Sequence, residues 1–522
     1  MSDGSPEVVW RPRVNPWWIA VAVMLATFME VLDTSIASVA LPYIAGNLGA
    51  TRDEATWVLT SYLVSNAIVL PTSAWCSSVF GRKRFLITCI IIFSVSSFVC
   101  GAASSLGILI LARVVQGVGG GALQPLSQAI LLESFPPAQR GAAMAVFGLG
   151  VVCAPIIGPT LGGWLTDTYS WRWAFYINVP VGILAVFLIS LLVEDPPYIR
   201  AASRGRMDTV GLGFMALWLA TLQIMLDRGQ EVDWFGAVWL RWFAVISAVS
   251  LVCFVVWELT TPHPIVDLRI LKNRNFAVGC ALYAMFGAGI YAQTTLQPLF
   301  LQTLLGYTAL DAGWSVSPRG VGSVAALILV GILARRIDSR ILSAFGFLVF
   351  GLASFLLSQV TLQIAMANIV PLNLLMGFGV GFIFVPLTTL AVGTLRNEQI
   401  GNASGIQNLV RNIGGSIGIS FVSTMLERYA QAHQYFMTAR LTPLEPGYQQ
   451  RIGAVQHIFA STFSSVDALA RSQAAIYNVL LQQANYWAFV ELFFAFALAC
   501  FVSIFGVLLF QKVKAIGEMH LE

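Results

Sequence analysis

Charged side chains are scarce in this sequence. Asp, Glu, Lys and Arg make up 10% of its 522 residues, against roughly a quarter in an ordinary soluble domain, and hydrophobic residues make up 57%. Apolar runs of about 17 to 25 residues, long enough to cross a bilayer, recur along the whole chain. The composition excludes a soluble globular domain and indicates an all-α polytopic membrane protein.

The sequence also lacks the motifs of catalysis and of ATP-driven transport. It contains no GxxxxGK[ST] phosphate loop, no CxxC or HxxxH spacing and no visible pairing of a nucleophile with its base. All seven cysteines fall inside apolar runs, so they do not indicate a disulfide framework. We therefore expect no enzyme activity, no cofactor, no metal site and no nucleic-acid partner, the membrane bilayer being the surroundings of the chain.

The apolar runs predict fourteen membrane-spanning helices. The predicted spans are residues 17–40, 57–79, 85–103, 106–132, 140–165, 173–193, 209–226, 237–257, 276–304, 310–334, 341–360, 366–393, 401–426 and 486–510. Because this number is even, both termini are expected on the same side of the membrane.

Basic residues gather on the side that carries the termini. With the N-terminus in the cytoplasm, the inside segments hold the clusters at 82–84, 204–206 and 335–336, and the short outside loops hold few basic residues. Cytoplasmic loops carry the excess of Lys and Arg, so we predict that both termini are cytoplasmic. The long connection 427–485 then lies on the outer side of the membrane. It is either a solvated loop or a docking surface for a partner protein.

Two stretches of the chain resemble each other. "GGGALQPLSQAILLESFPPAQRGA" (119–142) aligns with "GVGFIFVPLTTLAVGTLRNEQIGNA" (379–403) at an offset of about 260 residues. This repeat predicts an N-terminal six-helix bundle in residues 1–200, two inserted spans in 201–265 and a C-terminal six-helix bundle in 266–522. Two similar bundles that face a central cavity suit transport by alternating access.

The first predicted span carries two acidic residues, Glu30 and Asp33, in "MEVLDTSIASVALP". A charge at the centre of a span costs about 2.5 to 3.5 kcal/mol, so such groups normally face a cavity and have partners. Arg113 in the fourth span lies at a depth that matches Asp33. We predict that Asp33 pairs with Arg113 and that the two acids, Glu30 and Asp33, bind the coupling proton or a cationic substrate. The alternative is a buried pair that only fixes helix packing.

Further polar residues recur on one side of the fourth span and in the second half of the chain. Such a stripe on an apolar helix must face water or protein, so we expect it to line a substrate cavity. The alternative for each isolated Gln or Asn is a role in helix packing alone. The predicted cavity residues are Gln116, Gln124, Gln293, Gln297, Gln407, Arg411 and Asn412, with Arg319 of the tenth span beside them.

Several segments resemble motifs of the drug:proton antiporters of the major facilitator superfamily. They are "LDTSIASVALP" (32–42), "LILARVVQGVGGG" (109–121) and "APIIGPTLGG" (154–163), while "WRWAFYINVPVG" (171–182) and "LQIMLDRGQEVDWF" (222–235) are typical of the fourteen-span branch. The resemblance implies a role for Arg113 in proton coupling. It also implies close packing and bending of the fifth span at Pro155, Gly158, Pro159, Gly162 and Gly163.

One motif departs from the family pattern. The loop between the second and third spans usually reads G-x-L-A-D-R-x-G-R-K, and "AWCSSVFGRKR" keeps Gly81, Arg82 and Lys83 but has Ser78 in place of the aspartate. That aspartate normally helps to latch the closed conformation. The basic cluster is therefore either a gate or only an anchor that fixes the topology.

The resemblance implies proton-driven export of amphipathic or hydrophobic toxic compounds from the cytoplasm. It further implies a location in a bacterial inner membrane, with 427–485 in the periplasm and a periplasmic adaptor and an outer-membrane channel as partners. Two alternatives remain open at this point: a dedicated exporter of one endogenous metabolite, such as an antibiotic or siderophore, and a membrane sensor that has lost transport.

Overall fold

The structure is a computed structural model that describes residues 12–136, 139–195, 208–262, 264–334, 336–396, 399–439 and 441–511. Within these ranges it contains helices and no strand. Thirteen of the described helices are long and apolar enough to cross a bilayer, or fourteen when the bent helix α6 is counted as one span. The predicted all-α fold with about fourteen spans is confirmed.

The N-terminal half consists of helices that pack against one another. They are α1 (Pro16–Leu48), α2 (Arg52–Phe80), α3 (Arg82–Ala102), α4 (Leu106–Gly120), α5 (Leu123–Ser134), α6 (Arg140–Thr168), α7 (Trp173–Tyr176) and α8 (Asn178–Leu192). Helix α1 lies at the centre of this half, where it contacts α2, α5, α6, α7 and α8.

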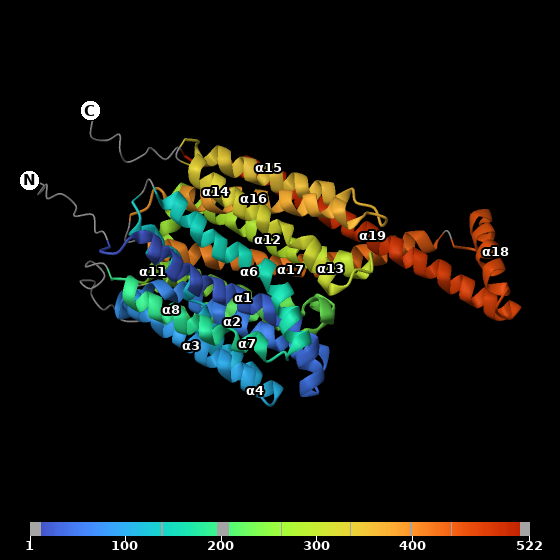
Figure 1. The fold of residues 1–522 in the computed structure, drawn as a ribbon, viewed down its shortest axis with the longest axis horizontal. Helices are drawn as coiled ribbons and strands as arrows, with labels where there is room; N and C mark the ends of the chain where they lie inside the picture. The colour runs from blue at the N-terminus through green and yellow to red at the C-terminus, as the bar shows by residue number, and fades with distance from the viewer. Residues whose placement is uncertain are drawn as a thin grey trace, which may run out of the picture.

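The C-terminal half repeats this plan around α12. Its helices are η4 (Leu268–Lys272), α12 (Arg274–Thr303), α13 (Ala309–Val316), α14 (Pro318–Leu333), α15 (Ser339–Ser358), α16 (Met366–Val392), α17 (Ile400–Thr438), α18 (Pro446–Ala460) and α19 (Ser465–Val507). Helix α12 contacts α13, α16, α17 and α19. The two halves lie one above the other in Figure 1 and meet along α6 and α14, and along α2, α5 and α17.

Two helices outside both halves cover one edge of this interface. They are α10 (Thr209–Arg228) and α11 (Val238–Thr260), joined by the short helices η2 (Gln230–Val232) and η3 (Trp234–Gly236). Helix α10 packs against α11, against α2 of the first half and against α17 of the second. It therefore touches both halves at once.

The fourth predicted span is broken into α4 and α5. The break follows three successive glycines, and a Cβ atom at Gly121 would lie 2.5 Å from the carbonyl oxygen of Asn66 in α2. Only glycine allows the chain to approach α2 so closely at this point. The break places Arg113 and Gln116 on α4 and Gln124 on α5, and all three serve the site described below.

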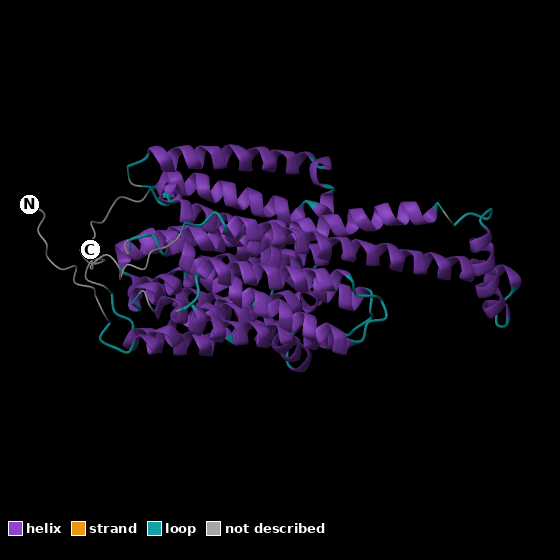
Figure 2. Cartoon of the chain, turned by 90° about the horizontal axis from the view of Figure 1, so that it is seen from above, coloured by secondary structure: helices purple, strands orange, loops and turns teal. Residues whose placement is uncertain are grey.

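The connection predicted at 427–485 is largely helical. Helices α17 and α19 have 39 and 43 residues. At 1.5 Å per residue each is about 60 Å long, roughly twice the hydrocarbon core of a bilayer. Both continue past the bundle and, with α18, form a projection at the end opposite to the start of α1 (Figures 1 and 2). Hydropathy had marked only the apolar half of each helix, because it reports burial in lipid and not helix formation.

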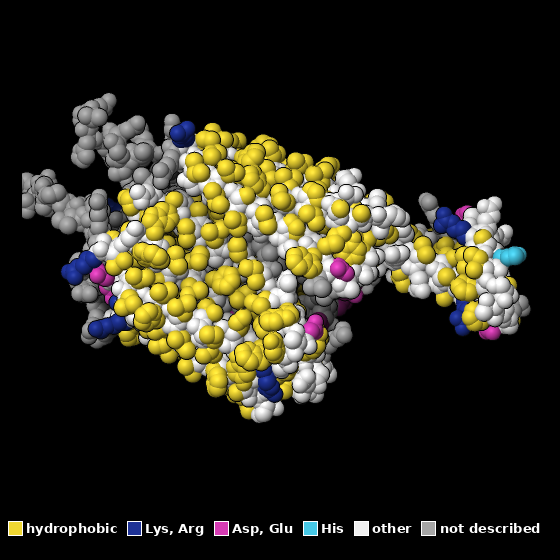
Figure 3. Space-filling view, viewed as in Figure 1, with side chains coloured by type: hydrophobic (Ala, Val, Ile, Leu, Met, Phe, Trp, Pro, Cys, Tyr) yellow, Lys and Arg dark blue, Asp and Glu magenta, His cyan; other side chains and the backbone are white. Residues whose placement is uncertain are grey.

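The surface agrees with a membrane setting. Figure 3 shows hydrophobic side chains over the middle of the molecule, and charged side chains mostly at its two ends and on the projection. We call the end that holds the start of α1 and the end of α19 the terminal side, and the opposite end the projection side.

Candidate transport site

Asp33 and Arg113 form an ion pair in the middle of the N-terminal half. Arg113 Nη1 lies 2.5 Å from Asp33 Oδ2, and both side chains are completely buried. Asp33 comes from α1 and Arg113 from α4, as their depths in the sequence predicted. Their exposure is zero, so neither side chain reaches water in this structure.

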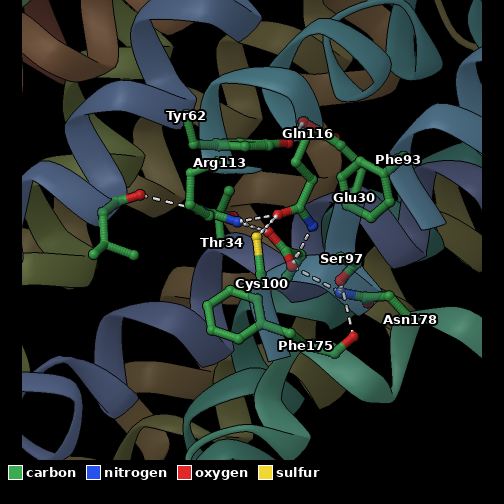
Figure 4. A network of polar contacts seen from close by, with 12 residues as sticks. Glu30, Thr34, Tyr62, Phe93, Ser97, Cys100, Arg113, Gln116, Phe175 and Asn178 are labelled. Atoms are coloured by element: carbon green, nitrogen blue, oxygen red, sulfur yellow. Dashed lines mark hydrogen bonds and ion pairs between the residues drawn. The ribbon is translucent and has the colours of Figure 1, made fainter. Parts of the chain in front are cut away.

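Neutral donors complete the shell of Asp33 (Figure 4). Its Oδ1 accepts hydrogen bonds from Gln116 Nε2 at 2.9 Å and from Asn178 Nδ2 at 2.7 Å. Asn178 also donates to Ser97 Oγ at 3.0 Å. Asn178 was absent from the predicted site residues. Its position in the motif "WRWAFYINVPVG" could have indicated it. The sixth span breaks there into α7 and α8, and the first turn of α8 faces α1.

Arg113 is held on three sides. Nε donates to the carbonyl oxygen of Val58 in α2 at 2.9 Å, and Nη1 also donates to Gln116 Oε1 at 2.8 Å. The guanidinium lies 4.2 Å from the centre of the Tyr62 ring, a cation–π arrangement. Nη2 makes no hydrogen bond. Arg113 is thus positioned by α1, α2 and α4 together.

Glu30 lies one turn before Asp33 but has different partners. Its carboxylate accepts from Gln124 Nε2 at 2.5 Å, from Asn66 Nδ2 at 3.2 Å and from the Tyr62 hydroxyl at 3.3 Å. The side chain is buried. Among the residues that the structure describes, no cation forms an ion pair with Glu30.

Polar side chains of α5 and α17 link the two halves. Arg411 Nη2 donates to Gln124 Oε1. One helical turn away, Asn408 Nδ2 donates to Gln128 Oε1 at 2.8 Å, and Gln128 Nε2 donates to Gln407 Oε1 at 3.4 Å. The predicted residues Gln124, Gln407 and Arg411 therefore meet at the interface between the halves.

A second buried arginine, Arg319 of α14, forms the polar centre of the C-terminal half. Nη2 donates to Gln297 Oε1 of α12 and, at 3.2 Å, to Asn373 Oδ1 of α16, while Nη1 lies 3.4 Å from Thr294 Oγ1. Nε has no partner. Arg319 belongs to no ion pair among the described residues, so its charge is surrounded by neutral groups alone.

A cavity of about 90 Å³ lies between the halves. Arg319 and Arg411 are the charged residues in its lining, and the rest is mostly apolar. The other lining residues are Val31, Val151, Pro155, Phe286, Ile290, Tyr291, Thr294, Val316, Ser323, Val380 and Phe384. The cavity thus combines an apolar wall with two guanidinium groups.

Of the seven predicted cavity residues, Arg411 lines this space and the other six do not. Gln116 donates a hydrogen bond to Asp33, and Gln297 accepts one from Arg319. Gln293 donates to Ser354 Oγ of α15 at 3.2 Å, inside the C-terminal half. Neither Gln293 nor Asn412 is part of the cavity lining.

Acidic residues elsewhere in the chain contact the basic loop between α2 and α3. Arg82 forms an ion pair with Glu133 at the end of α5. The Lys83 backbone N–H donates to Asp195 Oδ1 at 2.8 Å, and Lys83 Nζ donates to the Ser190 carbonyl at 2.6 Å. Gly81 adopts φ 85°, a backbone conformation that favours glycine. The loop therefore has acidic partners although the usual aspartate is missing.

Small residues of α6 allow it to pack closely on α1. A Cβ atom at Gly158 would lie 2.5 Å from Ser35 Cβ, and one at Gly162 would lie 3.2 Å from Ile36 Cα. A Cβ atom at Gly163 would meet nothing within 4 Å. Pro155 lines the cavity, and α6 bends by 44° between Pro155 and Thr160. The side chain of Pro159 lies outside the part that the structure describes.

The arrangement supplies charged and polar groups around an apolar space. It offers buried carboxylates, cations near an apolar cavity, and two halves that meet around that cavity. No group of His, Cys, Asp or Glu residues in the described ranges could hold a metal ion.

Comparison with known proteins decides the family. Residues 23–419 match the family model described as Major Facilitator Superfamily. The chain belongs to this superfamily. It is 36% identical to the multidrug export protein EmrB of Escherichia coli K12 over 95% of each chain, and 38% identical to the fatty acid resistance protein FarB of Neisseria gonorrhoeae over 82% of this chain and 84% of that protein. The family predicted from the span motifs is confirmed.

The fold also matches a solved structure of the superfamily. The human organic anion transporter MFSD10 superposes with a TM-score of 0.59 over 94% of this chain and 100% of that one. Its sequence is 15% identical, so the match supports the fold alone.

Proposed function

We propose that this protein is a proton-coupled exporter that moves amphipathic or hydrophobic toxic compounds out of the cytoplasm. The observation that carries the proposal is the fully buried pair of Asp33 and Arg113 in one of two repeated halves that enclose a cavity. Because Asp33 is sealed here as the carboxylate of an ion pair, it can take up a proton only in another conformation. Protonation and the movement of helices are thereby linked, as proton-driven transport requires.

The cavity lining favours compounds with an apolar body and a negative charge. Arg319 and Arg411 are buried and each has an Nε without a hydrogen-bond partner. A carboxylate or sulfonate can supply the missing acceptor, whereas an organic cation would face two positive charges. The relative FarB is named for resistance to fatty acids, which have this chemistry.

We place the protein in the bacterial inner membrane with the terminal side in the cytoplasm. The arginines and lysines near the terminal side support this orientation, since Arg82, Lys83, Arg84, Arg269 and Arg340 all follow or precede span ends there. The projection then lies in the periplasm.

The projection supplies a surface for a periplasmic adaptor, and through it for an outer-membrane channel. Tyr435, Phe436, Leu444 and Ile458 are 70 to 91% exposed on it. Helix α18 buries none of its own side chains. Apolar side chains in this position are otherwise open to water, which favours coverage by a protein partner.

Replacing α18 by a Gly-Ser linker tests the adaptor separately from transport. We expect the variant to transport normally in proteoliposomes and to lose drug resistance in whole cells. Equal resistance of cells with the shortened and the full protein would remove the projection from the proposal.

The transport proposal is tested in proteoliposomes with an imposed proton gradient. Wild-type protein should accumulate an anionic amphiphile when the gradient is present and lose this activity when nigericin and valinomycin collapse it. A matched control is Asp467→Asn, which removes an exposed carboxylate of the projection and should transport like the wild type. Transport that persists without a gradient would contradict proton coupling.

A further inference from the structure

The side-chain amide of Gln124 lies between Glu30 and Arg411 and forms a hydrogen bond with each of them. Gln124 donates from Nε2 to Glu30 Oε2 at 2.5 Å, and its Oε1 accepts from Arg411 Nη2. The donor end of the amide thus meets the acid, and the acceptor end meets the base. This is the orientation that charges on both partners require.

The link crosses from one half of the protein to the other. Glu30 belongs to α1 and Gln124 to α5, whereas Arg411 belongs to α17. Glu30 is 5% exposed, Gln124 7% and Arg411 3%, so water does not screen the attraction between the two charges. Glu30 therefore acts as the counter-ion of Arg411 although the two residues do not touch.

Within the described part of the chain, Arg319 has no such counter-ion. Its partners Gln297, Asn373 and Thr294 are neutral, and no described carboxylate pairs with it. The cavity lining thus holds two cations. Glu30 balances the charge of Arg411, and no described carboxylate balances the charge of Arg319. The balance of charge leaves one positive charge for a ligand to neutralise.

We propose that Glu30, acting through Gln124, sets the charge of the preferred substrate at one negative charge. This inference rests on the proposed function and deepens it. A neutral compound leaves Arg319 unbalanced in a buried site, and a compound with two negative charges brings one charge that has no partner. Glu30 and Gln124 are positioning residues in this scheme, and proton exchange is left to Asp33.

The experiment compares three probes with one ring system: naphthalene sulfonamide, naphthalene monosulfonate and naphthalene disulfonate. Each is tested as an inhibitor of proton-driven transport of an anionic reporter dye in proteoliposomes, in a buffer of about pH 8, well above the usual range of carboxylic acids. For the wild type we expect the monosulfonate to inhibit at concentrations about tenfold or more below those of the other two, since a buried charge without a partner is costly.

Two substitutions should shift this preference in the same direction. Glu30→Gln removes the counter-ion at nearly constant shape, and we expect the disulfonate to become at least as strong an inhibitor as the monosulfonate. Gln124→Leu cuts the link and keeps the charge of Glu30, so we expect a smaller shift of the same sign. Gln128→Leu, which removes a neighbouring amide between α5 and α17 without touching a charge, should keep the wild-type order.

The outcomes separate this inference from the proposed function. If the wild type transports the dye in response to the gradient and Glu30→Gln keeps the order of the three probes, Glu30 does not set the substrate charge. Should Glu30→Gln fail to fold, an unchanged order in Gln124→Leu overturns the inference in the same way. If the wild type does not respond to the gradient, the proposed function itself fails.

Discussion

Each half of this protein has a buried arginine at its centre, but the two arginines have different partners. In the N-terminal half, Arg113 pairs with Asp33. In the C-terminal half, Arg319 lies between Gln297 and Asn373, and Asn373 stands where the internal repeat places Arg113. One half therefore holds a carboxylate that a proton can neutralise, and the other holds a permanent cation. The comparison suggests that the first half handles the proton and the second half the substrate.

The largest effect is expected from removing the carboxylate of the N-terminal centre. Asp33→Asn leaves Arg113 buried without its counter-ion, and breaking such a pair costs about 3 to 5 kcal/mol of stability. We expect proton-driven transport in proteoliposomes to fall to the level of empty vesicles. Arg113→Gln should instead change the pH profile of transport.

Folding has to be checked for both variants, by size-exclusion chromatography and thermal unfolding in detergent. A folded Asp33→Asn protein with normal transport would mean that the pair only fixes helix packing. An unaltered pH profile for Arg113→Gln would support the same conclusion.

A carboxylate added to the C-terminal centre should make the two halves alike. Gln297→Glu places an acid where Gln297 already accepts a hydrogen bond from Arg319. The new ion pair would balance the cation, so we expect the apparent affinity for an anionic amphiphile to fall about tenfold to a hundredfold, with neutral compounds affected less. Gln293→Glu is the matched control, because Gln293 faces Ser354 and not the cavity. Equal losses in the two variants would argue against a role of Arg319 in substrate binding.

A moderate effect is expected from the neutral shell of Asp33. Asn178→Leu removes one of the two amides that donate to Asp33 Oδ1. Hydrogen bonds between helices inside a membrane contribute up to about 1 to 2 kcal/mol, so we expect a transport rate several-fold below the wild type. Asn178→Gln should restore part of the rate if the amide itself positions Asp33. No recovery with glutamine, together with a loss of thermal stability in both variants, would assign Asn178 to helix packing.

The smallest effect is expected at the terminal side, where both partners of an ion pair belong to the same half. Arg82→Gln and Glu133→Gln should each lower thermal stability and leave the preference among substrates unchanged. In a double-mutant cycle we expect a coupling energy of about 0.5 to 3 kcal/mol between them. A coupling near zero would mean that Arg82 only anchors the topology.

The sequence predicted some parts of this site because the cost of charge in a membrane leaves few choices. Asp33 and Arg113 had to find partners at matching depth, and their pairing followed from counting residues along two spans. Asn178 was missed because an uncharged amide inside a span costs less than a charge, so its position alone does not require a partner. Gln293 was predicted to line the cavity, and the structure places it against Ser354, since a polar stripe does not say which neighbour it faces.

The linear sequence determined that this chain crosses a membrane many times and that Glu30 and Asp33 lie on the first span, and its internal repeat predicted two related halves. Apolar runs, internal repeats and charges within apolar runs can each be read from the sequence itself, so they are recognised without knowledge of the fold. Only the tertiary structure decided that Gln124 connects Glu30 to Arg411, that no carboxylate among the described residues pairs with Arg319, and that α17 and α19 extend beyond the bundle. These features depend on how helices from distant parts of the chain are rotated against one another, because that rotation selects which side chains meet.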